Sequence, residues 1–560
     1  MSPLSDLVSK LAHLSPFGKS ADDPLVSLKA ANRWLENLPL ADTLKSQQAI
    51  HEQLKRFEGG AEQFTRERLA IFMCLDEKTR DLQDTLTHQY LRNPRMSRQV
   101  ESQLWHAIYG FYWDLARGYS AFALALAREP RKPPQDTVLP VVTLRAMRAF
   151  GQLLKWRAIR YLPVTDKLWQ RLHKFYRSAE EGGFHRAPLR AYPDDPTDCT
   201  CETAYLHILM LNLANSGSLY PRQIDQIDRW LMGWHGRLAL STTFQSDVHA
   251  FVVDLSADHG PRRVRKTESD KPLRFWSTAT LLAKLEETRE RLRAGTDLDP
   301  DDLPAIPRTA DNIELLEYLQ HQWDSLEKRE QRRAPRAAVK LLIDVTHGLT
   351  AIVQQIKAVN TPPEASPYGI GLDSRQADEV LIYGFVTDRT RGHPSTHRAP
   401  SGGHADVERW VMEDESKFGF GATVESRDRD WLRVGALIGL RVQETEEWRL
   451  GVIRRLTRVT DDTTRIGIEA LAETPTLAML YDTTTPSYTV NGIDNSGATL
   501  PHASLWLAGE PASVIIDPVL YAPGKVFEVR GLAEHRHLAL AQPLEHCEGW
   551  MRVRVEPVKR

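Results

Sequence analysis

Cysteine is scarce in this 560-residue chain, which contains four of them: Cys74, Cys199, Cys201 and Cys547. So few cysteines cannot form a disulfide scaffold for a chain of this length, and they are typical of a reducing compartment. A strong charge of one sign is also missing, because the formal net charge is −2. A near-neutral protein has no global field to hold DNA or anionic lipid, so we expect any anion-binding site to be local.

Long apolar segments are missing as well. The longest runs, such as Ala121–Ala127, fall far short of the ~20 residues that a membrane-spanning helix needs. The first twenty residues lack the apolar core and the small-residue cleavage site of a secretory signal. Together these absences predict a cytoplasmic protein without a membrane span.

Sequence signatures of catalysis and of metal binding are absent too. The chain has no Gly-x-Ser-x-Gly, no His-Glu-x-x-His, no Walker loop and no dinucleotide fingerprint. Cys199 and Cys201 have a spacing that zinc sites do not use, and no second cysteine pair accompanies them. We therefore expect neither an enzyme nor a metal site.

What the sequence does contain is a long helical region. Residues 25–326 are predicted to form an all-α module, either an irregular solenoid or a bundle, after a flexible N-terminus at 1–24. Within it, His249–Lys266 alternates like a strand, which predicts a β-hairpin near 248–266 with solvated arginines. Asp311 is expected to open the last helix, with Glu314 as its capping-box partner.

The remainder of the chain is rich in strand-like segments. They predict an antiparallel β-barrel at 327–475 and a further C-terminal β unit at 476–560, so the fold class is α+β multidomain. Residues 386–408 are rich in Gly, Pro, Ser and Thr, which is typical of a mobile insertion. The predicted strands include Phe420–Glu425, Leu437–Val442, Arg449–Arg454, Arg465–Leu471, Ser513–Ile516, Lys525–Arg530, His537–Ala541 and Trp550–Val555.

Two short motifs lie on either side of this insertion. The first is an Arg-Arg-x-x-Arg within the basic run 328–336, and the second is an Asp-x-Ser-x-x-Gly at the approach to the later strands. Each is weak alone, because basic runs are usually solvated helix ends and Asp, Ser and Gly are common in turns. The candidate site residues are Arg332, Arg333, Arg336, Asp414, Ser416 and Gly419.

In this order the two motifs resemble the signatures of the PilZ domain, the bacterial receptor domain for cyclic di-GMP. The resemblance covers residues 328–475 and implies a PilZ-like barrel whose arginines bind guanine edges and phosphates, while Asp and Ser hold the remaining base edge. The residue types suit this ligand. An arginine fork matches guanine O6 and N7 and pairs with phosphate, whereas guanine N1 and N2 are donors that a carboxylate can accept.

One feature departs from the PilZ pattern. Arg336 and Asp414 are 78 residues apart, and the family normally places its signatures closer together. A loop at 386–408 inserted before the second barrel strand would account for the separation at a small cost in closure entropy. A different topology would leave the pocket assignment open.

The sequence thus predicts a cyclic di-GMP effector in bacterial signal transduction, with no cofactor and with an unidentified protein partner for its helical module. One alternative is a scaffold whose degenerate PilZ-like barrel binds no nucleotide. Another is a nucleic-acid binder that uses Arg262–Lys266 and the run at 328–340. The near-neutral charge disfavours nucleic acid, because affinity for DNA rests largely on neutralising phosphates.

Overall fold

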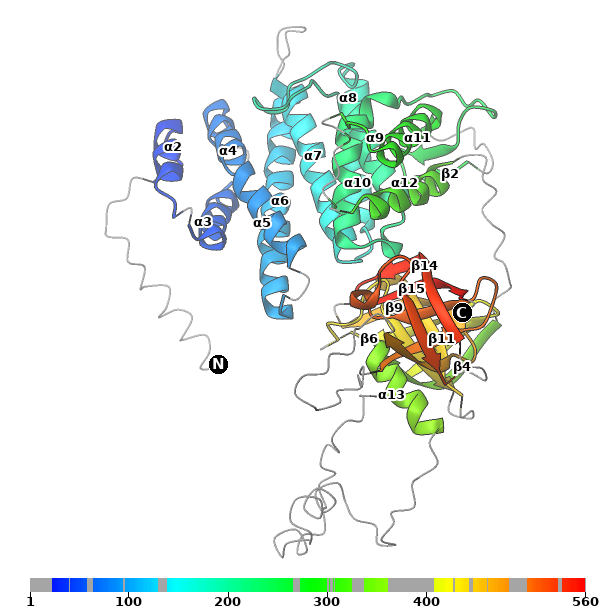
Figure 1. The fold of residues 1–560 in the computed structure, drawn as a ribbon. Helices are drawn as coiled ribbons and strands as arrows, with labels where there is room; N and C mark the ends of the chain where they lie inside the picture. The colour runs from blue at the N-terminus through cyan, green and yellow to red at the C-terminus, as the bar shows by residue number, and fades with distance from the viewer. Residues whose placement is uncertain are drawn as a thin grey trace, which may run out of the picture. The chain divides into compact units, whose positions relative to one another are not determined.

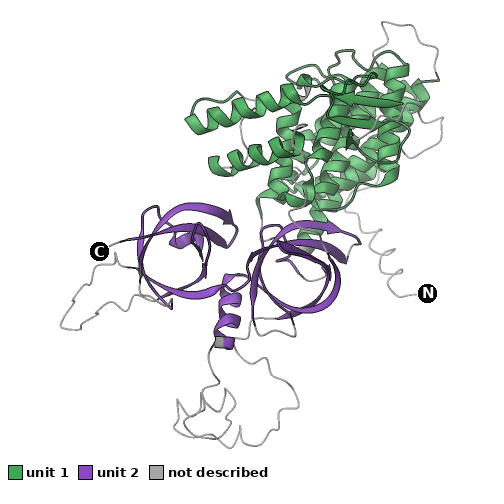
Figure 2. Cartoon of the chain, turned by 90° about the vertical axis from the view of Figure 1, so that its right-hand side faces the viewer, with its two compact units in different colours: residues 1–328 green, residues 329–560 purple. Residues whose placement is uncertain are grey.

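The chain forms two compact units in the computed structural model, residues 1–328 and 329–560, coloured green and purple in Figure 2. Each unit is described below by itself. The structure describes residues 23–39, 41–57, 64–93, 96–128, 138–264, 272–299, 302, 306, 308–324, 337–360, 407–426, 429–442, 447–460, 462–482, 501–531 and 536–558.

The first unit is largely helical, which confirms the predicted all-α module (Figure 1). Its centre is α7, which contacts α6, α8, α9 and α10 and is buried along most of its length. A helix that is apolar on most sides belongs in the middle of a bundle. The helices are α2 (Leu28–Glu36), α3 (Thr43–Lys55), α4 (Arg66–Lys78), α5 (Arg80–Arg92), α6 (Arg98–Leu126), α7 (Val138–Ile159), α8 (Asp166–Glu181), α9 (Cys201–Leu213), α10 (Pro221–Trp234), α11 (Ala279–Ala294) and α12 (Thr309–Trp323).

A small antiparallel sheet interrupts these helices. Its strands are β1 (Phe251–Asp254), β2 (Arg262–Arg263) and β3 (Leu273–Trp276), in the order β2-β1-β3. The segment predicted as a hairpin thus supplies β1 and β2, and the sheet gains a third strand that the sequence did not indicate. Residues 265–266 lie outside the described part of the chain.

The predicted solvation of the hairpin arginines is wrong for Arg263. Its guanidinium donates to the backbone carbonyls of Asp324 and, at 2.8 Å, of Gln322. These carbonyls lie at the end of α12, where the last turn lacks intrahelical donors. Arg263 therefore caps α12 from a distant part of the chain.

The predicted capping box of α12 is also wrong. The helix begins at Thr309 after Arg308, which has no capping side-chain hydrogen bond. Asp311 instead lies inside the first turn, where its carboxylate is 3.7 Å from the Arg308 guanidinium. A carboxylate at that position still favours the helix, because it faces the positive end of the helix dipole.

The second unit contains two closed six-stranded barrels, which confirms the predicted β-barrel followed by a further β unit. Their strand orders are β4-β5-β6-β9-β8-β7 and β10-β11-β12-β15-β14-β13, so the two barrels have the same topology. The strands are β4 (Ala337–His347), β5 (Glu408–Ser416), β6 (Gly419–Glu425), β7 (Leu437–Val442), β8 (Arg449–Arg458), β9 (Thr463–Ala472), β10 (Thr476–Asp482), β11 (His502–Leu507), β12 (Ser513–Ile516), β13 (Val526–Arg530), β14 (Arg536–Cys547) and β15 (Trp550–Pro557).

The helix α13 (Leu349–Asn360) follows β4 and was not predicted. It buries Ile352 and Ile356 in a core that includes Leu437 of the first barrel and Trp550 of the second. The Trp550 indole also donates to the carbonyl of Gly435, at 2.9 Å. Figure 2 shows the two barrels side by side, and this shared core joins them.

The segment between α13 and β5 lies mostly outside the described residues, and so does nearly all of the predicted insertion at 386–408. No helix in the described part of the chain combines the length and the apolar character that a bilayer crossing requires.

Candidate functional site

The second motif forms the turn between β5 and β6. Ser416 is the last residue of β5 and pairs with Gly419, the first residue of β6. The Ser416 hydroxyl donates to the Gly419 carbonyl oxygen at 3.0 Å and so closes the two-residue turn. At the tip of the turn, the Phe418 side chain is 44% exposed.

Gly419 lies where β6 runs close against β9. A Cβ built at this position would clash with the backbone carbonyl oxygen of Ile468. Backbone cannot move aside as a flexible side chain can, so this position requires glycine. The third residue of the motif therefore has a structural role in the hairpin.

Replacement of Gly419 by alanine should destabilise the second unit by about 1–3 kcal/mol, the usual cost of overpacking. Gly467→Ala is a matched control in the same sheet, because its Cβ would lie 3.4 Å from the nearest atom, Cβ of Arg455. Urea unfolding followed by circular dichroism measures both variants. Equal urea midpoints for Gly419→Ala and Gly467→Ala would contradict the close approach of the Ile468 carbonyl oxygen to Gly419.

Asp414 lies on the outer face of β5, opposite Gly421 of β6. Side chains alternate along a strand, and Phe420 and Ala422 are buried inside the barrel, so Gly421 belongs to the outer face. The Asp414 carboxylate occupies the space above Gly421, where a Cβ would lie 2.7 Å from Oδ2. The Asp414 side chain keeps 17% of its surface exposed.

Arginine reaches the same place from β9. Nη2 of Arg465 lies 3.6 Å from Oδ2 of Asp414, and Nε of Arg465 lies 3.8 Å from Oε2 of Glu413. The Arg465 side chain is 59% exposed. Next to it, Gly467 pairs with Gly421, so neither of these two positions carries a side chain, and the Asp414 carboxylate covers Gly421.

Sequence reasoning missed Gly421 and Arg465. A glycine inside a strand often marks a close approach, so the alternation Gly419-x-Gly421 was a usable signal. Arg465 carried no such signal, because only the pairing of β6 with β9 brings it to Asp414.

The first motif lies outside the described residues: this applies to Arg332, Arg333 and Arg336. The residue that follows it, Ala337, begins β4 and pairs with Glu415, and Ala338 pairs with Asp414. The long separation between the motifs therefore does not change the topology at this point, since β4 and β5 are neighbours. The structure brings Asp414, Ser416 and Gly419 together in one hairpin beside the start of β4.

Comparisons with known proteins bear on both units. A family model for the N-terminal domain of the cyclic-di-GMP receptor FimW matches residues 29–246, and one for the middle PilZ domain of that receptor matches residues 386–476. Residues 386–476 are therefore similar to a PilZ domain, and residues 29–246 are similar to the domain that precedes it in that receptor. The PilZ match includes strands β5 to β9 and the second motif, which confirms the resemblance, while Arg332–Arg336 precede the matched segment.

A curated relative of this chain is the cyclic-di-GMP receptor FimW of Pseudomonas aeruginosa. The two sequences are 24% identical over 399 residues, which is 64% of this chain. The match spans 63% of the relative, which is less than two thirds of its length.

Proposed function

We propose that this protein is a receptor for cyclic di-GMP and that the nucleotide binds where β4 meets the β5–β6 hairpin. The observation that carries the proposal is the pairing of Ala338 with Asp414. It brings the chain that leaves the first motif directly to the carboxylate of the second. The curated relative is named as a receptor for the same nucleotide.

Chain length keeps the arginines close to this hairpin. Arg336 is bonded to Ala337, whose partner across the strands is Glu415. Arg332 is four residues further back, and four extended residues span at most ~14 Å. In the proposed complex, arginine forks bind guanine O6 and N7 and the phosphate oxygens.

The hairpin supplies the complementary groups. The Asp414 carboxylate accepts from guanine N1 and N2, which are donors that arginine cannot satisfy. The Ser416 hydroxyl donates its hydrogen to the Gly419 carbonyl. Its oxygen can therefore act only as an acceptor toward a ligand or an arginine. Gly421 and its partner Gly467 add no side chain of their own next to the Asp414 carboxylate, which itself covers Gly421.

Titration calorimetry of the full chain with cyclic di-GMP tests the proposal, with GTP and cyclic GMP as controls. We expect a dissociation constant of ~1 μM or tighter, about −8 kcal/mol of binding free energy. GTP and cyclic GMP should bind far more weakly, because each presents one guanine. Absence of binding would instead favour a scaffold whose barrel takes no nucleotide.

Replacement of Asp414 by asparagine should weaken binding less than loss of an arginine, and it should reduce selectivity for guanine. The amide keeps one acceptor but adds a donor that faces guanine's own donors. Calorimetry with cyclic di-GMP and with its adenine counterpart measures affinity and selectivity together.

The matched control is Glu413→Gln, because this neighbour also contacts Arg465 but is not part of the motif. Unchanged affinity in both Asp414→Asn and Ser416→Ala would remove the hairpin from the proposed site.

We further propose that nucleotide occupancy is transmitted to a protein partner through the helical unit. The first unit ends at Lys328 and the second begins at Arg329, so the basic run is also the covalent connection between them. A ligand that binds several of these arginines acts directly on that connection. The ligand can favour one relative orientation of the units only to the extent that it binds that orientation more tightly than the others.

Small-angle scattering of the full chain at saturating cyclic di-GMP tests this coupling. The range of distances between the units should narrow in the wild type and stay broad in Arg336→Ala. An unchanged profile, with binding verified by calorimetry, would leave a receptor without this form of coupling.

A further inference from the structure

The helical unit contains a cavity that the nucleotide site does not use. It measures about 350 Å³ and is bounded by α4, α5, α6, α7, α9, α10 and the loop that precedes α9. This size is within the range of small-molecule sites. Its wall carries acidic and basic side chains whose burial is costly unless they are paired, so their partners indicate what the cavity can hold.

One end of the cavity is internally balanced. Nζ of Lys155 lies 2.6 Å from Oδ1 of Asp225 and 2.7 Å from Oδ2 of Asp228. Nε2 of His207 is 2.8 Å from Asp228, and Nε of Arg229 is 2.9 Å from Asp225. These groups satisfy one another and need no ligand.

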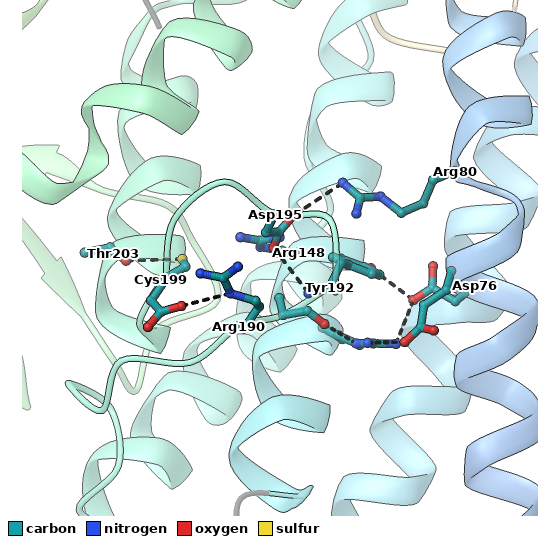
Figure 3. A network of polar contacts seen from close by, with 12 residues as sticks. Asp76, Arg80, Arg148, Arg190, Tyr192, Asp195, Cys199 and Thr203 are labelled. Carbon is teal, nitrogen blue, oxygen red and sulfur yellow. Dashed lines mark hydrogen bonds and ion pairs between the residues drawn. The ribbon is translucent and has the colours of Figure 1, made fainter.

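At the other end, two arginines surround the carboxylate of Asp195 (Figure 3). Arg148 and Arg80 share the carboxylate of Asp195, at 2.6 Å and 3.4 Å respectively. The two guanidinium groups have about ten N–H donors, and Asp195 offers them about four acceptor positions. The second carboxylate here, Asp76, already accepts from the hydroxyls of Tyr119 and Tyr192. The sulfur of Cys199 is a further neighbour of Arg148, but Nε of Arg148 is buried without a hydrogen-bond acceptor among the described residues.

A short loop holds this end in place. The backbone groups of Leu189 and Cys199 exchange two hydrogen bonds of 2.9 Å, which close a compact loop of the kind that often carries function. From this loop, the Tyr192 hydroxyl donates to Asp76 at 3.0 Å. The Tyr192 ring lies against Arg80, whose Cζ is 4.3 Å from the ring centroid. The guanidinium of Arg80 is thus oriented before any ligand arrives.

We propose that this cavity binds a small organic anion whose carboxylate or phosphate oxygens accept from Arg80 and Arg148 beside Tyr192. Arginine forks recognise both groups by paired hydrogen bonds. Lys155, Phe111 and Tyr112 also line the cavity. The site lies within the first unit and is separate from the proposed nucleotide site in the second.

The full chain is titrated with sodium phosphate in one arm and sodium succinate in another, against sodium chloride of equal ionic strength. Thermal unfolding followed by tryptophan fluorescence reports binding, because a ligand of the folded state raises the midpoint with concentration. We expect at least one anion to raise the midpoint beyond chloride. If only phosphate raises the midpoint, the ligand carries a phosphate group. If only succinate raises it, the ligand carries a carboxylate.

Variants locate the site. Arg80→Ala removes a guanidinium that is 40% exposed, and Arg148→Lys keeps the charge but loses the fork; each should weaken anion binding at least tenfold. Arg190→Ala is the matched control, since this loop arginine is 51% exposed and pairs with Asp198 instead. No stabilisation of the wild type beyond chloride overturns the proposal, and so does an equal anion response in wild type and Arg80→Ala.

Discussion

Replacement of Arg332 or Arg336 by alanine should each weaken cyclic di-GMP binding by about 1.5–3 kcal/mol, the scale of charge-assisted hydrogen bonds. That corresponds to a loss of roughly tenfold to a hundredfold in affinity. In the proposed complex, each arginine fork makes two parallel hydrogen bonds to a guanine edge or a phosphate, and alanine would remove both of them. Titration calorimetry measures the loss directly.

Arg329→Ala is the matched control for these variants. It removes the same charge from the same basic run but lies outside the motif, so only the general attraction to phosphate should decrease. Wild-type affinity in both motif variants, with circular dichroism showing an intact fold, would refute the site. An equal loss in Arg329→Ala would reduce the motif to a nonspecific basic patch.

Replacement of Lys155 by methionine should destabilise the helical unit by about 3–5 kcal/mol, the usual cost of removing one partner from a buried ion pair. Lys155 is nearly buried between Asp225 and Asp228, and its loss leaves two carboxylates inside the bundle. Urea unfolding followed at the helical signal measures the effect. Lys174→Met, on the exposed side of α8, should change stability by less than about 0.5 kcal/mol.

The effect of Lys155→Met should depend on pH. Burial alone would raise the pKa of Asp228, but the ammonium of Lys155 and the imidazole of His207 hold it below its usual range. Such a group contributes stability above its unfolded pKa of about 3.9 and loses it as pH falls toward the folded pKa. The gap between wild type and Lys155→Met should therefore be full at pH 7 and shrink below about pH 4. A gap that is constant over this interval would show that lost packing, not charge, causes the effect.

Local pattern was enough for part of the fold. Two strands, Leu437–Val442 and Ser513–Ile516, have the predicted bounds, because turn residues flank their buried apolar runs. Helix α13 was missed although its apolar residues have helical spacing. Its burial depends on a core to which both barrels contribute, and local sequence carries no information on that partner.

The residues of the candidate site also fall into two groups, those that local sequence could indicate and those that only strand pairing reveals. Asp414, Ser416 and Gly419 could be named from sequence because they occupy a single turn, where residue type and spacing are local properties. Arg465 could not be named, because its proximity to Asp414 follows from the pairing of β6 with β9. The proximity of the start of β4, which follows the arginine motif in the chain, to the hairpin likewise required the pairing of Ala338 with Asp414.

The core shared by α13 and the two barrels limits how the chain can be shortened. A truncation at residue 475 would follow the change from one barrel to the next, yet it would remove Leu505, Ile515 and Trp550 from that core. Leu437 would then face water, and the carbonyl of Gly435 would lose the Trp550 indole. The barrels are therefore separate in topology but share one apolar core. An excised first barrel would expose an apolar surface that favours aggregation, so the two barrels are best produced and studied together.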